Sequence, residues 1–108
     1  MVTITIAYPN AAGSRFDMEY YLGTHMPMSA GLLSTHPEFR SCTIERGLSG
    51  AEPGSPPPFA AVCHFVFDSL DGFMAAFTPH AAQLQGDIPS YTDIVPVIQI
   101  SDVAFQRS

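Results

Sequence analysis

Phe16-Asp17-Met18-Glu19-Tyr20-Tyr21-Leu22-Gly23-Thr24-His25-Met26-Pro27 is the stretch that organises this chain, because it places two tyrosines and a histidine on one helical segment. Tyr21 and His25 are four residues apart, so in a helix they lie on the same face. An imidazole beside a phenol can bind a polar group or move a proton near neutral pH. We therefore expect a functional site to be built around this pair.

The residues on either side of this stretch predict a strand followed by an interrupted helix. Val2 to Tyr8 alternate in polarity as a half-buried strand does. Ser14 is placed to cap a helix running from about Arg15 to about Leu33. Pro27 lies inside that helix and removes a backbone hydrogen bond, so we expect a bend or break close to His25.

The remainder of the chain completes a β-α-β-β-α-β order within one domain covering residues 1–108. The expected elements are a strand at 41–48, a Gly/Pro-rich loop at 50–58, an apolar strand at 59–67, helical segments at 70–77 and 79–85, and a last strand at 94–105. This order is typical of an α+β ferredoxin-like sandwich with both helices on one face of an antiparallel sheet.

The composition indicates that the opposite sheet face is covered by a second copy of the chain. Apolar residues make up 46% and charged residues 13% of the sequence, against roughly 25% charged residues in typical soluble domains. The first, third and last strands look apolar on both faces, so a bare face would expose apolar surface. Packing two sheets face to face in a homodimer would cover it.

The charge pattern argues against nucleic-acid or membrane partners. The net charge is −6, no lysine occurs, and the four cations are scattered arginines, whereas phosphate and anionic lipid surfaces require clustered cations. Cys42 and Cys63 have no metal-finger or CxxC spacing and are expected to be free thiols. We find neither a signal-peptide pattern nor a membrane-spanning run, and we expect a cytoplasmic protein.

The pattern Phe16-Asp17-x-x-Tyr20-Tyr21-x-x-x-His25-x-Pro27, after a strand ending in Tyr8-Pro9, resembles the EthD domain family of the dimeric α+β barrel superfamily. The resemblance covers nearly the whole chain. It implies a homodimer and a pocket in each subunit between the sheet and its helices. The family is named from bacterial degradation of ethyl tert-butyl ether, and related proteins include polyketide dehydratases, cyclases and cofactor-free monooxygenases, so the fold does not fix the reaction. The proline-rich loop at 50–58 departs from the usual pattern.

The candidate site residues follow from the motif and from the polar groups on the apolar strands. We expect His25 and Tyr21 to be catalytic. Tyr20, which is also a candidate for core packing, Phe16, Tyr91 and His64 are expected to contact the substrate. His64 faces either the helices, where it would meet His25 across a cleft, or the partner subunit, and the alternation favours the cleft. No HxH or HxxxH pair suggests a metal, and we expect no cofactor.

Three functions remain open from the sequence. The first is an enzyme or enzyme-like protein that binds a hydrophobic, oxygen-bearing metabolite, with His25 as the acid or base of a cofactor-free proton transfer or oxidation. The second is a dimeric binding or accessory protein in which His25 only anchors an apolar ligand. The third is an assembly module without a ligand. A cavity beside His25 would disfavour the third.

Overall fold

The computed structural model describes residues 1–108, and its four strands form one antiparallel sheet in the order β2-β3-β1-β4. The strands are β1 (Val2–Pro9), β2 (Phe39–Arg46), β3 (Phe59–Phe67) and β4 (Val97–Asp102). β1 and β3 form the centre, and β2 and β4 are the two edges. This arrangement confirms the predicted ferredoxin-like α+β fold.

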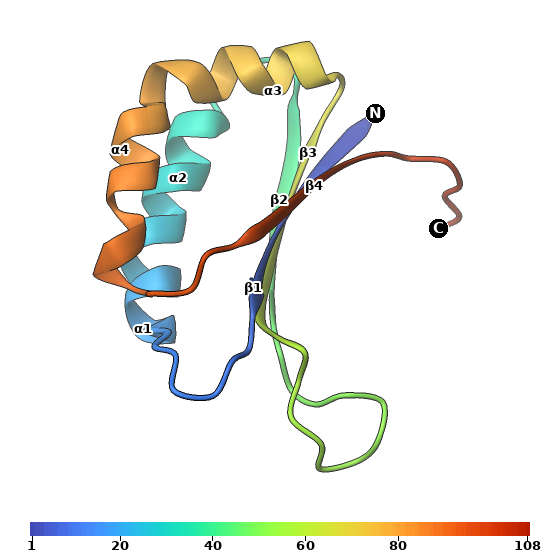
Figure 1. Ribbon diagram of the computed structural model, residues 1–108. Coiled ribbons are helices and arrows are strands. Elements are labelled where there is room, and N and C mark those ends of the chain that lie inside the picture. Colours follow the sequence, from blue (N-terminus) through green and yellow to red (C-terminus); the bar gives the residue numbers. More distant parts are fainter.

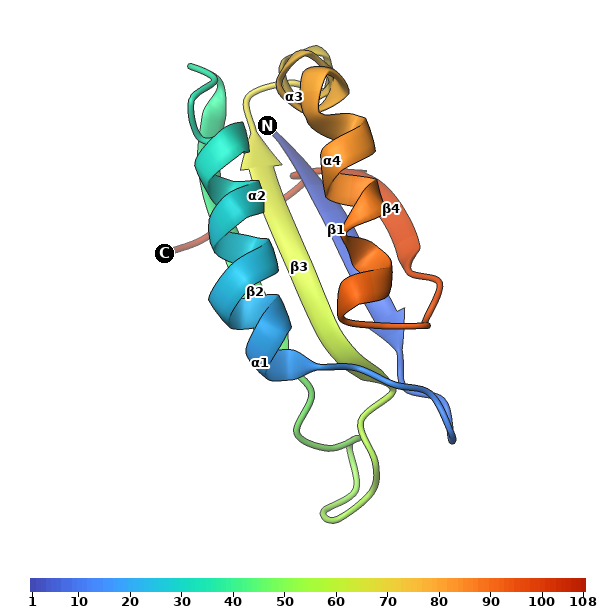
Figure 2. The same ribbon diagram turned by 90° about the vertical axis from the view of Figure 1, so that its left-hand side faces the viewer.

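Two helical segments cover one face of this sheet and leave the other open (Figure 1). The first consists of α1 (Met18–Tyr20), a π turn (Tyr21–His25) and α2 (Met26–Leu33), and the second of α3 (Leu70–Phe77), a 3-10 turn (Thr78–His80) and α4 (Ala81–Gly86). A further 3-10 turn spans Ile88–Ser90 before β4. α2 and α4 run side by side over the sheet (Figure 2). None of these helices has the length and apolar character needed to cross a membrane.

The sheet face beneath the helices carries the hydrophobic core. Ile4 pairs with Phe65, and Ile6 pairs with Cys63, so alternate side chains of both central strands point toward the helices. The buried members on this face are Ile4, Tyr8, Ala61, Cys63, Phe65 and Phe67. Both cysteines are free thiols, as predicted, although Cys42 is only half-buried.

The open face carries a row of polar side chains across the middle of the sheet, so it is less apolar than expected, although Val62, Val66 and Val97 share it. Thr43, His64, Thr5 and Gln99 are neighbours in the strand register. His64 therefore lies away from the helices, and its predicted position in the cleft was wrong. The alternation allowed either face; the bulky Phe65 and Phe67 occupy the helix side, where aromatic burial gains most.

His64 is held on this open face by two polar neighbours. Its Nε2–H donates to Glu45 Oε1 at 3.0 Å, and its Nδ1 accepts from the Thr5 hydroxyl at 3.2 Å. These bonds satisfy both ring nitrogens.

The irregularity expected near Pro27 is a π turn that leaves the helical path unbroken. The backbone N–H of Met26 bonds to the carbonyl of Tyr21, five residues back. Pro27 has no N–H, and in a regular helix its ring would crowd the carbonyl of Gly23; the wider π turn relieves that contact. The helix begins at Asp17, whose carboxylate accepts from the Tyr20 N–H, and not at Ser14 as predicted.

Strand β4 is shorter than the predicted 94–105 for a reason visible in its pairing. Val97 pairs with Ala7 at one end, and Asp102 pairs with Val2 at the other. Pro96 cannot donate a ladder hydrogen bond, and after Asp102 the partner strand has ended. The residues that follow leave the sheet on the side away from the helices (Figure 1).

Candidate functional site

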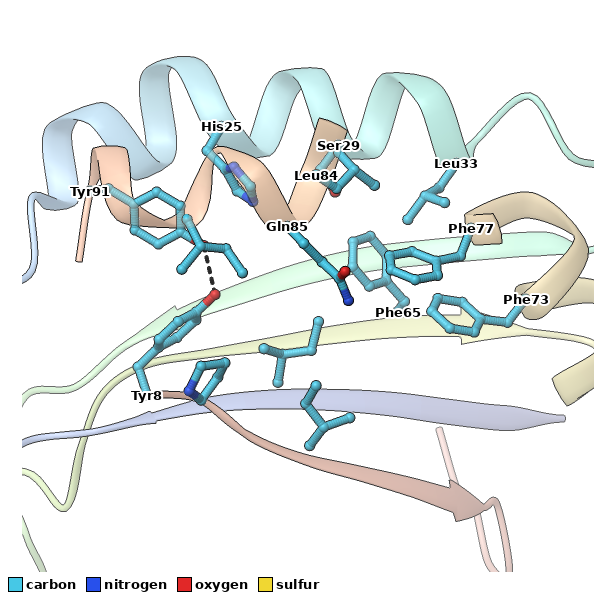
Figure 3. Close-up of a pocket in the computed structure, with 14 residues that line it drawn as sticks. Tyr8, His25, Ser29, Leu33, Phe65, Phe73, Phe77, Leu84, Gln85 and Tyr91 are labelled. Carbon is cyan, nitrogen blue, oxygen red and sulfur yellow. Dashed lines mark hydrogen bonds between the residues drawn. The ribbon is translucent and has the colours of Figure 1, made fainter. Parts of the chain in front are cut away.

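A cavity of about 100 Å³ lies between the helices and the sheet. Figure 3 shows His25 entering it from the helix layer and Tyr8 from the sheet. Ten of its fourteen lining residues are hydrophobic, so most of a bound molecule would meet apolar atoms. The ten include Tyr8 and Tyr91, whose hydroxyls add to the polar groups of the wall; the other polar side chains are His25, Ser29 and Gln85.

His25 is buried at the end of the π turn, with 6% of its surface exposed. Its ring lies between two aromatic neighbours: it stacks on Tyr21 with centroids 5.9 Å apart, and it contacts Tyr91 with centroids 4.6 Å apart. Its Nδ1–H donates to Asp87 Oδ2 at 2.9 Å. A carboxylate can only accept, so this bond places the proton of the neutral ring on Nδ1 and leaves Nε2 as a basic nitrogen.

Asp87 lies in the segment that follows α4 and keeps the His25 ring in this orientation. Its second oxygen accepts from the Tyr20 hydroxyl at 2.8 Å. Partial burial by itself raises the pKa of Asp87, but the hydrogen bonds from His25 and Tyr20 outweigh it and keep the pKa below the usual carboxyl value. Asp87 is therefore a carboxylate at neutral pH, and it can orient His25 and stabilise the protonated ring.

Tyr8 and Tyr91 form the second polar feature of the wall. Their hydroxyl oxygens are 2.7 Å apart, and both residues are buried. Tyr8 comes from the end of β1, whereas Tyr91 follows the 3-10 turn, so the bond ties the sheet to the segment that carries Asp87. Burial raises the pKa of both phenols above the ordinary value, which keeps them protonated.

The two residues expected to be catalytic have different surroundings. His25 lines the cavity, but Tyr21 does not. The Tyr21 hydroxyl is buried without a hydrogen-bond partner, and burial raises its pKa. Tyr21 therefore meets His25 through its ring face, and the hydrogen bond that orients His25 is made with Asp87.

Of the residues expected to contact substrate, only Tyr91 lines the cavity. Phe16 packs against the two tyrosines of the wall; its ring centroid is 5.1 Å from that of Tyr8 and 5.6 Å from that of Tyr91. Tyr20 acts on His25 through Asp87. His64 lies on the opposite face of the sheet. No group of three or more histidine, cysteine or carboxylate side chains is placed to hold a metal ion.

The sequence reasoning missed Asp87, Tyr8 and Ser29. Tyr8 had a usable signal, because it ends the face of β1 that also carries Ile4 and Ile6. Ser29 is four residues after His25 and so shares its helix face. Asp87 had no local signal, since it lies in an irregular segment that meets His25 only in the folded chain.

Residues 14–94 match the EthD domain family. An EthD-like protein from Ralstonia eutropha JMP134 is 44% identical, with a TM-score of 0.89; the match covers 99% of this chain and 95% of that chain. An EthD family protein from Bacillus halodurans C-125 is 20% identical, with a TM-score of 0.68; the match covers 94% of this chain and 97% of that chain.

The fold also extends to SnoaB, a cofactor-independent oxygenase from Streptomyces nogalater. It is 18% identical with a TM-score of 0.63, over 98% of this chain and 94% of that chain. At that identity the likeness concerns the fold alone. No protein with a curated description matches the sequence.

Proposed function

This chain belongs to the EthD domain family, and from that premise and its site we propose that it binds a hydrophobic, oxygen-bearing small molecule in the cavity and that His25 moves a proton to or from it. The observation that carries the proposal is the hydrogen bond from His25 Nδ1 to Asp87, 2.9 Å long, in the wall of an apolar cavity. It leaves Nε2 as the acceptor, and a general base needs such a free, oriented nitrogen.

Each residue has a distinct part in this proposal. Asp87 fixes the tautomer and stabilises the imidazolium that forms when Nε2 takes a proton. Tyr20 holds the other carboxylate oxygen and so restrains Asp87. The apolar lining excludes water from around the ligand, which strengthens the polar interactions within the cavity.

The proposed ligand class includes ether-derived and polyketide-type compounds, since both combine apolar surface with oxygen. Proton transfer by His25 needs no cofactor. A cofactor-free oxidation, the activity stated for SnoaB, would require a substrate whose deprotonated form itself reacts with oxygen.

A binding or accessory protein is the second candidate, because the same cavity would hold an apolar metabolite without any reaction. A substitution at His25 distinguishes the enzyme from the binding protein. His25→Gln should abolish turnover but retain most affinity if the protein is an enzyme, and His80→Gln provides the same chemical change at a histidine outside the cavity. Unchanged turnover in His25→Gln would remove the catalytic role.

The occupancy of the cavity can be tested first. Native mass spectrometry of gently purified protein should detect a retained small molecule. Ser29→Leu, which enlarges a buried residue of the cavity wall, should release it, whereas Ser34→Leu at the exposed end of α2 should not. Equal retention in both variants would place the ligand elsewhere.

We also propose that a second copy of the chain covers the open face and the edge strand β4. Val97, Ile98 and Ile100 along β4 are all about half exposed or more, and Phe105 in the projecting tail is 86% exposed. An apolar edge strand with unpaired backbone groups favours association with another chain. Because Ile98 also lines the cavity, a second subunit at this edge would narrow its mouth.

A further inference from the structure

The Tyr8 and Tyr91 hydroxyls have one more proton than their mutual hydrogen bond uses. Each phenol carries one O–H donor, and a single bond joins the two oxygens at 2.7 Å. Neither hydroxyl has another hydrogen-bond partner in the protein. Whichever tyrosine donates, the accepting tyrosine keeps an O–H that is free to donate elsewhere.

The surroundings of this free donor leave few partners other than a ligand. Both tyrosines are buried, and both line the cavity. A buried donor without a partner carries a desolvation cost of about 1–3 kcal/mol, so an acceptor atom in the cavity would be stabilised there. The raised pKa of each phenol keeps the proton in place at neutral pH.

We propose that this free O–H binds the carbonyl oxygen of an enolisable ketone or related carbonyl compound, and that His25 takes the proton from the carbon next to that carbonyl. The inference rests on the proposed function and names its substrate class. Tyr91 and His25 pack with ring centroids 4.6 Å apart, so the donor and the base border the same part of the cavity. A carbonyl oxygen bound by the tyrosine pair would therefore lie in the same cavity as the His25 imidazole.

The step balances without an oxidant or reductant. Nε2 of His25 accepts the proton, and the C–H electron pair becomes the new C=C bond. The carbonyl π pair moves onto the oxygen, where the free tyrosine O–H stabilises the enolate charge. Return of the proton to a different atom would complete an isomerisation, and attack of the carbanion on a second carbonyl in the same molecule would complete a ring closure.

The test compares two probes of nearly the same shape, acetophenone and α-methylstyrene, which differ in C=O against C=CH₂. Wild-type protein should bind acetophenone more tightly by about five-fold or more, the value of a typical net hydrogen bond. In Tyr8→Phe/Tyr91→Phe this preference should disappear. The double variant is the appropriate choice because it removes both partners of a buried bond, which leaves no unsatisfied group.

The single variants provide the internal check, since each retains one hydroxyl facing the cavity. Tyr8→Phe and Tyr91→Phe should each keep part of the preference. Binding of both probes with an unchanged ratio in the double variant would overturn this inference and leave the proposed function standing. Failure of both probes to bind wild-type protein would contradict the proposed function itself, and the inference with it.

Discussion

Asp87 determines what His25 can do, because it is the residue that bonds the imidazole. Asp87→Asn keeps the shape but offers an amide N–H that favours the opposite tautomer. We expect the catalysed exchange of deuterium into the methyl group of acetophenone to fall by about 10²-fold or more. Asp71→Asn, at an exposed position of α3, is the matched control and should exchange as wild type does.

The acid stability of the protein should also depend on Asp87. Its pKa is lowered in the folded state, chiefly because hydrogen bonds from His25 and Tyr20 outweigh the effect of burial. The carboxylate therefore stabilises the fold above the ordinary carboxyl pKa of about 3.9, and this contribution is lost as the pH falls through the folded-state pKa. Below about pH 4, the free energy of unfolding should decrease more steeply in wild type than in Asp87→Asn. Denaturant titrations across that range with the same slope in both proteins would contradict this.

At the site, the sequence predicted the residues that a local motif could carry. His25 and Tyr91 both line the cavity, and their roles toward a substrate stay predictions. The hydrogen bond that orients His25 joins positions 62 residues apart, and no periodicity predicts such a contact. His64 was misplaced because strand alternation defines two faces without saying which one meets the helices.

Among the elements, the start of the first helix differs most between the prediction and the structure. Asp17 accepts a hydrogen bond from the Tyr20 N–H, whereas Ser14 bonds back to the Ala11 carbonyl in the preceding turn. Asp17→Ala should therefore lower the free energy of unfolding by about 1 kcal/mol, and Ser14→Ala should lower it by clearly less. Denaturant unfolding of both variants measures this, and a larger loss for Ser14→Ala would restore the sequence-based assignment.

The order and kind of the elements were predictable because each has a local cause. Alternation marks the strands, Gly50 to Pro58 can form only a loop, and Ser69 caps α3. The ends were less predictable. β4 ends where its partner β1 ends, and the π turn depends on how the helix accommodates Pro27. The end of β4 depends on the strand beside it, and the π turn depends on the preceding helical turn. The sequence of one segment alone predicts neither.

At the scale of the whole molecule, we predict that two copies of the chain associate through the open sheet face. Val97 on that face is 55% exposed, and Met74 on the outer side of α3 is 45% exposed. Val97→Glu would bury a charge in the proposed interface, so we expect its dimer dissociation constant to rise at least about ten-fold. Met74→Glu should leave it unchanged. Sedimentation equilibrium measures both, and a monomeric wild-type protein would contradict the proposed dimer.

The central claim is that Asp87 orients His25 so that Nε2 is the base in the cavity. Locating the proton on the His25 ring tests this claim most directly, because the measurement requires no knowledge of the natural substrate. Long-range ¹H–¹⁵N NMR of the imidazole reports which nitrogen carries the proton. We predict that the neutral form of the ring carries its proton on Nδ1, and that the resonance of the unprotonated Nε2 moves when phenol is added, because a phenol bound in the cavity would donate to it. A neutral ring whose proton is on Nε2, or an Nε2 resonance that does not respond to phenol, would contradict the orientation of His25 by Asp87 or its place in the ligand cavity.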